Sequence, residues 1–355
     1  MAVTNITPQE LCLKIQHNLE NVSGNIPTNI DSLGTLNALQ SAENTAGFEK
    51  ISTTRTDGKL FSASVKFKQG KCYTPVEEEL DVCDAVSEAT NPNKEYSVSV
   101  DEVVQVPITL NAETFRVMCD TLDERKNWEL VQAVEALQRK VNNKLISKIT
   151  ADLDNYYNGN SSAIGGSDEI SLKLFTSDGK PNTMGFYQLI QMYKKLGYLD
   201  RMPIVVGGDP LEAWKFARNQ FAGNFDKQYD TSKIAGMSMF TDYKIDDYAS
   251  DGSQHLISFI PGHLQLLESY KNVGAYEVMR QEGMRTTMTM NNFTFDIDIS
   301  NPFCSDGVVT MLLSKRFDLF KVPSTAFSSC GARETVLGWQ ADCGALTCSD
   351  LKVLS

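Results

Sequence analysis

The longest regular pattern in the chain is a stripe of apolar residues that recur at steps of three or four between Trp128 and Tyr157. That spacing puts them on one face of an α-helix, and Gly159 is the first helix-breaking residue after them. We expect a helix over residues 124–157, roughly 45 Å long, which must run along a flat lobe or bridge two lobes. A coiled coil is the alternative, but the stripe is short for one. The residues expected on the buried face are Leu130, Val134, Leu137, Val141, Leu145, Ile149 and Leu153, with Tyr156 continuing the spacing.

A pattern of period two precedes this helix. Apolar and polar residues alternate from Phe48 to Tyr73, and Asp57-Gly58 supplies the two-residue turn typical of a β-hairpin. The faces of this hairpin, residues 48–75, are too weakly apolar for a buried core strand. We therefore expect it to project from the body, with basic residues on its tip and flank.

The segments around the helix predict an α+β fold with more than one lobe. Residues 1–47 are polar and irregular, so they are expected to be disordered or to lie on another surface. A loop rich in Gly, Ser and Asn over 158–182 is the candidate boundary before a compact α/β lobe at about 183–265. Strict alternation in the last third, residues 265–325, predicts half-buried antiparallel strands that pack on the long helix. The last residues, 326–355, are expected to form an irregular tail.

Composition narrows the class of protein. The 355 residues carry a formal net charge of -12 and a sequence pI of about 4.8, so direct binding of a phosphate backbone is not expected. No apolar run approaches the roughly 20 residues that span a bilayer, and the N-terminus lacks the blocks of a signal peptide. We expect a cytosol-like compartment, and therefore reduced thiols for the eight cysteines.

The motifs that carry catalysis or metal binding are missing from the sequence. HxH, HExxH and CxxC are absent, and Cys330, Cys343 and Cys348 have no evident fourth ligand nearby. Gly207-Gly208-Asp209 matches neither glycine-rich nucleotide motif and is better explained as a tight turn followed by a helix cap. The acidic pairs Asp246-Asp247 and Asp296/Asp298 are expected on the solvated surface. The sequence thus predicts no catalytic, cofactor-binding or metal site, and a protein that is not an enzyme.

The order of these segments resembles the major capsid proteins of tailed bacteriophages with the HK97-type fold. That family has an N-terminal arm, an extended hairpin called the E-loop, a spine helix, an A-domain and a β-rich P-domain. The corresponding residues would be 1–47, 48–75, 124–157, 183–265 and 266–325, with 76–182 as the part of the P-domain that contains the spine helix. The strand segments Met202–Gly208 and Ile257–Gly262 resemble A-domain strands of such proteins.

The resemblance implies a structural protein that self-assembles through hexamers and pentamers into an icosahedral shell. It implies location in the virion capsid after assembly in the host cytoplasm, enclosure of DNA without sequence-specific binding, no membrane and no cofactor. Scaffolding, portal and decoration proteins are possible partners. Contact between subunits through the E-loop would involve Asp57, Gly58, Lys59, Lys66 and Lys68. An equal alternative is that these lysines only keep an exposed edge soluble.

Three other functions remain open at this point. A tail-tube or other virion protein shares the projecting hairpin but does not need so long a helix. An encapsulin-like cellular shell shares the fold of the resemblance. A two-lobed cytosolic enzyme or binding protein would be a monomer or small oligomer that a ligand stabilises.

Overall fold

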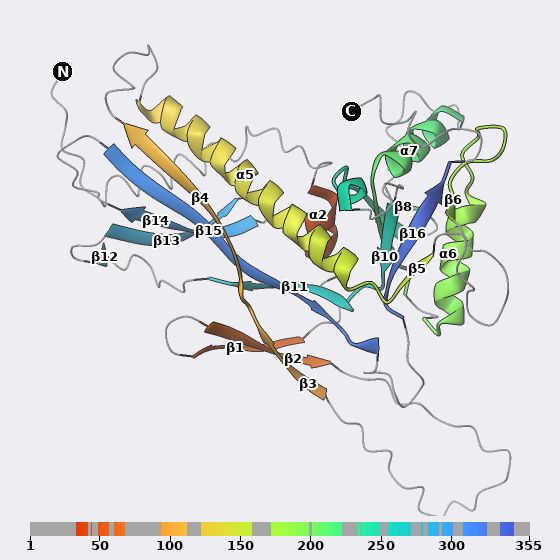
Figure 1. Ribbon diagram of the computed structural model, residues 1–355, viewed down its shortest axis with the longest axis horizontal. Helices are drawn as coiled ribbons and strands as arrows, with labels where there is room; N and C mark the ends of the chain where they lie inside the picture. The colour runs from red at the N-terminus through yellow and green to blue at the C-terminus, as the bar shows by residue number, and fades with distance from the viewer. Residues whose placement is uncertain are drawn as a thin grey trace, which may run out of the picture.

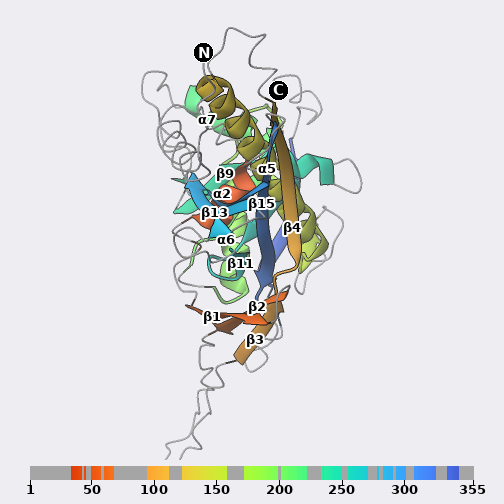
Figure 2. The same ribbon diagram turned by 90° about the vertical axis from the view of Figure 1, so that its left-hand side faces the viewer.

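The computed structural model mixes helices and strands in an α+β fold that forms a flat body (Figures 1 and 2). The structure describes residues 33–41, 44, 49–56, 60–67, 94–111, 122–157, 172–198, 201–221, 233–234, 236–248, 255–270, 278–279, 283–290, 293–300, 308–324 and 334–343. Three sheets organise these residues. We call the two larger sheets with their helices the β lobe and the α/β lobe, and the smallest one the hairpin sheet.

The β lobe is a six-stranded antiparallel sheet covered by one long helix. Its strands run in the order β11-β15-β14-β13-β12, and β4 pairs with the other edge of β15. Helix α5, Leu122–Ala151, lies along β4 and β15 (Figure 1). The strands are β4 (Glu102–Asn111), β11 (Leu264–Ser269), β12 (Val278–Met279), β13 (Gly283–Met290), β14 (Phe293–Ser300) and β15 (Val308–Lys321).

The alternation of residues in β14 and β15 produces the core of this lobe. Phe293, Phe295 and Ile297 on β14 are buried, as are Met311 and Leu313 on β15, and all pack in one cluster with the apolar face of α5. Neighbouring strands present these side chains together because Ile297 lies opposite Leu313 in the ladder. The expectation that the last third packs on the long helix therefore agrees with the fold.

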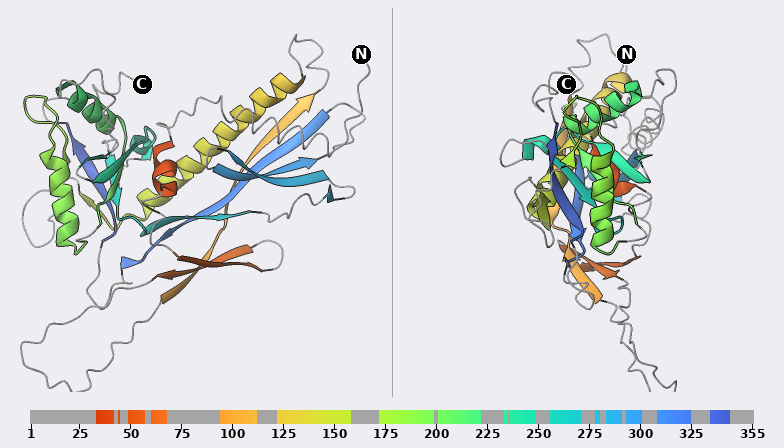
Figure 3. Two further views of the ribbon diagram at one scale, coloured as in Figure 1. Left: turned by 180° about the vertical axis from the view of Figure 1, so that it is seen from behind. Right: turned by 90° about the vertical axis from the view of Figure 1, so that its right-hand side faces the viewer.

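The α/β lobe is a seven-stranded sheet in the order β5-β16-β10-β7-β9-β8, with β6 pairing with β16. Helices α6 (Met184–Lys195) and α7 (Asp209–Phe221) lie at the far end of the molecule from the start of α5 (Figure 3). A 3-10 turn, η2, spans Ile245–Tyr248. The strands are β5 (Asn155–Tyr157), β6 (Leu172–Lys173), β7 (Ile204–Gly207), β8 (Lys233–Ile234), β9 (Met237–Thr241), β10 (His255–Phe259) and β16 (Val336–Asp342).

Both faces of this second sheet are buried, which explains its nearly continuous apolar strands. On β7, Ile204 and Val206 join the core that contains α5, whereas Val205 joins a second core with α6 and α7. Trp214 of α7 and Phe186 of α6 meet edge to face in that second core, with ring centroids 4.8 Å apart. The α5 core therefore continues from one lobe into the other.

The long helix is shorter than the predicted range 124–157 at its C-terminal end. It stops at Ala151, and Asn155–Tyr157 form β5, which pairs in parallel with β16. Tyr156, which continued the helical spacing in the sequence, therefore lies on a strand. Gly338 of β16 makes this possible, since a Cβ there would come within 2.7 Å of a Tyr156 ring carbon.

Two predicted domain boundaries were wrong because strands join sheets formed by distant parts of the chain. The predicted tail, 326–355, contains β16, which lies between β10 and β5 inside the α/β lobe. Strand β11 begins at Leu264, inside the range 183–265 expected for the α/β lobe, and pairs with β15 of the β lobe. The α/β lobe is thus assembled from two separate stretches of chain, β5 to β10 and β16.

The N-terminal range 1–47 contributes to the core rather than only lying on a surface. Helix α2, Gly34–Gln40, buries Leu36, Ala38 and Leu39 in the core that holds α5. The predicted short helix at Leu11–Leu19 lies outside the described residues.

Candidate assembly elements

The predicted hairpin is part of a three-stranded sheet. Strand β1 (Glu49–Thr56) pairs with β2 (Leu60–Phe67), with Thr56 opposite Leu60, and β2 pairs with β3 (Lys94–Ser99). Figures 1 and 3 show this hairpin sheet set apart from the two larger sheets. The sequence missed β3 as the third strand, because its partner lies more than 25 residues away along the chain.

Of the five E-loop residues singled out in the sequence, the structure describes only Lys66. Asp57, Gly58, Lys59 and Lys68 lie outside the described residues. The backbone of Lys66 is described: it lies on β2, opposite Glu49 of β1 and Glu95 of β3. Contact between subunits through these residues therefore stays a prediction.

A two-residue joint connects the hairpin sheet to the β lobe. Strand β3 ends at Ser99 and β4 begins at Glu102, so the chain passes between two sheets within Val100 and Asp101. Val100 is only 1% exposed, which fixes the joint against the body. The Ser99 hydroxyl donates a hydrogen bond of 2.7 Å to the Asp101 carboxylate, closing the turn.

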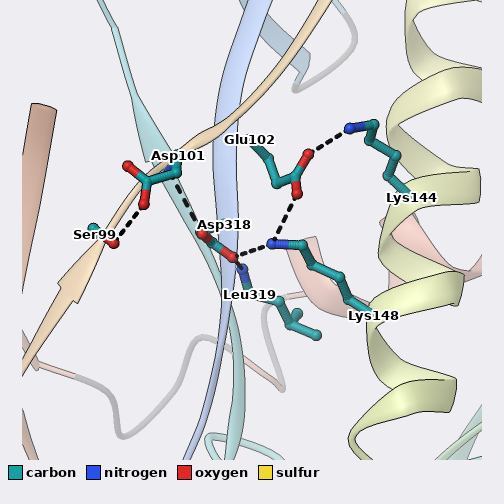
Figure 4. A network of polar contacts seen from close by, with 7 residues as sticks. All are labelled: Ser99, Asp101, Glu102, Lys144, Lys148, Asp318 and Leu319. Atoms are coloured by element: carbon teal, nitrogen blue, oxygen red, sulfur yellow. Dashed lines mark hydrogen bonds and ion pairs between the residues drawn. The ribbon is translucent and has the colours of Figure 1, made fainter. Parts of the chain in front are cut away.

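Four charged residues clamp the joint from the side of α5 (Figure 4). Lys148 lies with its Nζ 2.7 Å from Asp318 Oδ1 of β15 and 3.4 Å from Glu102 Oε1 of β4. Lys144, one turn earlier, donates to the other oxygen of Glu102. Because the two lysines are four residues apart on α5, they lie on the same face of the helix, and both contact the first residue of β4.

The clamp shifts the pKa values of its members. The hydrogen bond from Lys144, together with the charge of Lys148, holds the pKa of Glu102 below its usual range. Burial of Lys148 works against its charged form, but the hydrogen bond and charge of Asp318 outweigh it and raise the pKa of Lys148. Both shifts favour the charged forms, so the clamp is an ion-pair network at neutral pH.

The predicted apolar stripe of α5 faces both lobes. Leu130, Val134, Leu137, Val141, Leu145 and Ile149 are each at most 1% exposed, and Leu153, beyond the helix end, is partly buried against the same core. The opposite face carries charges, including an exposed Arg139 near Glu135. Helix α5 therefore connects the sheet of the β lobe with the α/β lobe.

The residues considered for chemistry have structural roles where the structure describes them. Gly207 ends β7 and Asp209 begins α7, and a Cβ on Gly208 would come within 2.1 Å of the Asp246 carboxylate. Asp247 is exposed as expected, whereas its neighbour Asp246 is half-buried and accepts a hydrogen bond of 3.1 Å from the backbone N–H of His255. Asp296 is not on the solvated surface: it is 5% exposed and accepts a hydrogen bond of 2.6 Å from Thr287 on the neighbouring strand.

The structure corrects one expectation about the cysteines. Cys343, the residue after β16, is disulfide-bonded, so the expectation of reduced thiols is wrong for this residue. Within the described ranges, no group of three His, Cys, Asp or Glu side chains is arranged to hold a metal ion. In the same ranges, no helix is both long and apolar enough to cross a membrane.

Comparison with known proteins finds similarity in structure alone. No protein-family model and no curated protein sequence matches the chain. Among solved structures, the Cyanophage A-1(L) capsid asymmetric unit aligns with a TM-score of 0.47 and 9% identity, covering 89% of this chain and 94% of that one. The capsid of Ralstonia phage GP4 aligns with a TM-score of 0.44 and 9% identity, covering 89% and 93%.

A cellular shell protein is also among the matches. The holo-SrpI encapsulin complex from Synechococcus elongatus PCC 7942 aligns with a TM-score of 0.39 and 11% identity, covering 71% of this chain and 77% of that one.

Proposed function

We propose that this protein is a major capsid protein, a structural subunit that self-assembles into an icosahedral shell around a viral genome. In this proposal the hairpin sheet is the E-loop, α5 is the spine helix of an HK97-type fold, the α/β lobe is the A-domain and the β lobe is the P-domain. The subunits associate in hexamers and pentamers, and the protein is not an enzyme.

The observation that carries the proposal is the hairpin sheet, which is separate from both larger sheets and reaches the β lobe through the Val100-Asp101 joint. Its described residues Tyr96 and Val98 are half-buried and belong to neither core. The ring of Tyr96 meets that of Phe320 on β15, with centroids 5.8 Å apart, and is still partly exposed. A small sheet needs a covered apolar face to be stable in water. A neighbouring subunit in a lattice supplies such a cover.

The flat body supports the same proposal. Helix α5 is tied to β4 and β15 along the β lobe and reaches the α/β lobe through a continuous core. One continuous, plate-like unit results, with the hairpin sheet along one edge (Figures 1 and 2). A plate with fixed outline is the shape that tiles a closed surface, whereas an enzyme with a cleft between lobes depends on motion between them.

Electron microscopy of the purified protein, or of particles from its source, tests the proposal. We expect closed shells or ring-shaped capsomers. Tubes would instead favour a tail-tube protein, and shells loaded with a protein cargo would favour a cellular encapsulin-like shell. A monomer or small oligomer under all conditions, together with a melting temperature that rises with a small ligand, would contradict assembly and favour an enzyme.

A variant that lacks the hairpin strands makes the test specific. Replacing residues 49–67 by a short Gly-Ser linker removes β1 and β2, two of the three strands of the hairpin sheet, and keeps every element of the two larger sheets. We expect this variant to melt within a few degrees of the parent and to form no shells. Shells at the parental yield would show that the hairpin sheet is not an assembly element.

A further inference from the structure

Helix α2 lies where the two lobes meet, and its own sequence gives it little stability. It has seven residues, its own N-cap residue, Leu33, makes no side-chain hydrogen bond to the helix, and its first turn holds no acidic residue. An isolated helix of two turns does not persist in water. Its order therefore comes from its surroundings: α5 of the β lobe, β7 and β9 of the α/β lobe, and β11.

The first backbone N–H groups of α2 are capped by side chains from both lobes. The N–H of Thr35 donates to Asp242 Oδ2 at 2.9 Å, and Asp242 follows β9 in the α/β lobe. The N–H of Leu36 donates to Asn142 Oδ1 at 2.9 Å, and Asn142 belongs to α5. These are donors that a helix leaves unpaired at its start, so each lobe supplies one of the missing acceptors.

The two capping side chains also bind each other. Asn142 Nδ2 donates to Asp242 Oδ2 at 2.8 Å, and the Thr35 hydroxyl donates to the same oxygen at 2.7 Å. Asp242, Asn142 and Thr35 are each at most 1% exposed. Oδ1 of Asp242 accepts a fourth hydrogen bond, from the N–H of Lys244 at 3.1 Å. A buried carboxylate with four donors is costly to disturb, because donors left behind in the core stay unpaired.

The chain after α2 is bound at a second point between the lobes. Asn44 is fully buried, and its Nδ2 donates to the carbonyl of Leu264 at 2.8 Å. Its Oδ1 accepts the N–H of Gly262 at 3.0 Å, and its own carbonyl accepts from the Gln265 side chain at 2.7 Å. Residues 260–264 are where the chain passes from β10 of the α/β lobe to β11 of the β lobe.

Helix α2 is packed so closely against its neighbours that it fits in only one position. A Cβ on Gly34 would come within 2.1 Å of the Thr241 carbonyl oxygen, so the start of the helix lies directly against the end of β9. Leu36, Ala38 and Leu39 fill the core between the lobes.

We propose that residues 33–41 together with Asn44 form a strap that locks the two lobes in one relative orientation, and that assembly requires the strap to be bound in this position. Asp242 and Asn142 are its positioning residues at one end, and Asn44 is the anchor at the other. The assembly part of this inference rests on the function proposed above, whereas the lock between the lobes does not.

Hydrogen exchange and particle yield together test the strap. Thr35→Val removes one donor to Asp242 with little change in volume, and Asp242→Ala removes the shared acceptor. We expect exchange of the strap residues to rise about tenfold in Thr35→Val, the effect of one lost buried hydrogen bond, and further in Asp242→Ala. Exchange in α6, a helix of the second core, should stay at the parental rate, and particle yield should fall in the same order.

A matched control and the contrary outcomes make the result decisive. Asp247→Ala removes an exposed carboxylate from the same loop, one that pairs with Lys244, and should leave exchange and assembly unchanged. Parental exchange over the strap in Thr35→Val would overturn the lock, as would equal loss of protection in α6. A loosened strap with parental particle yield would overturn its role in assembly. If the unmodified protein forms no particles, the capsid proposal fails, while the exchange data still decide the lock.

Discussion

The carboxylate of Asp154 lies 2.8 Å from the backbone nitrogen of Thr335, which is 181 residues further along the chain. The same Oδ2 accepts the N–H of Val336 at 3.0 Å, and Oδ1 is 2.9 Å from the ammonium of Lys321. Asp154 thus ties the end of α5 to the start of β16 and to the last residue of β15. The pKa of Asp154 lies below its usual range because these hydrogen bonds and the Lys321 charge outweigh its burial.

Asp154→Asn should therefore destabilise the protein. The substitution removes the charge and turns one acceptor into a donor, so we expect the free energy of unfolding to fall by roughly 2–3 kcal/mol. Urea unfolding at neutral pH measures this. Asp152→Asn, two residues earlier and exposed, is the control and should unfold within about 0.5 kcal/mol of the parent. Equal effects of the two substitutions would contradict the role of Asp154.

Val141→Asp tests the buried stripe of α5. Val141 is 0% exposed in the core that joins the lobes, and an unpaired carboxylate there costs several kcal/mol. We expect loss of the cooperative melting transition and of assembly together. Lys140→Asp changes the exposed neighbour and should melt close to the parent. A Val141→Asp protein that melts and assembles normally would mean that α5 is not buried along this face.

The ion-pair clamp at the hairpin joint predicts a pH-dependent contribution. Lys148→Met leaves Glu102 with one partner and Asp318 without its ammonium partner, and should cost about 1 kcal/mol near neutral pH because the groups are partly exposed. The pKa of Glu102 is lower in the folded state than the ordinary 4.5, so this stability is present above pH 4.5 and is lost as the pH falls below that value.

The measurement is the difference in unfolding free energy between parent and Lys148→Met at neutral pH and at about pH 3.5. The difference should shrink in acid. Lys140→Met, which removes an exposed lysine from α5, should show no such trend. A difference that stays constant with pH would contradict an electrostatic clamp.

His263 predicts a separate dependence on pH. Its burial, and then the nearby charge of Arg201, lower the pKa of His263 to about 4 from the ordinary 6.5. Between these two values the unfolded chain binds a proton that the folded protein does not. Stability should therefore fall as the pH drops from 6.5 toward 4, by up to about 1.4 kcal/mol per pH unit.

His263→Phe removes the titrating group and should flatten this slope. Phe keeps an aromatic ring against Tyr198, whose ring centroid lies 5.5 Å from that of His263. Arg201→Gln should flatten the slope only slightly, since burial is the larger cause of the shift. Thermal melting from pH 7 to about pH 4.5 gives the slopes, and an unchanged slope in His263→Phe would assign the effect to other groups.

The elements with strong periodicity were predictable because local spacing reports which face is buried. The stripe from Leu130 to Ile149, the alternation of Phe293, Phe295 and Ile297, and the strand-turn-helix around Gly208 all lie where their patterns place them. The hairpin turn signal at Asp57-Gly58 also lies between two paired strands. These patterns, and the segment order they produce, led to the α+β fold and to the capsid resemblance.

Only the tertiary structure decided what the weakly patterned segments do. Asn155–Tyr157 continue a helical spacing, yet they form a strand because β16 pairs with them and Asp154 turns the chain. Helix α2 has few apolar residues, and its place depends on Asn142 and Asp242, about 100 and 200 residues away. Asp296 was expected on the surface, but Thr287 on the neighbouring strand donates a hydrogen bond to its carboxylate. Such contacts leave no local period in the sequence, because their partners become neighbours only when the chain folds.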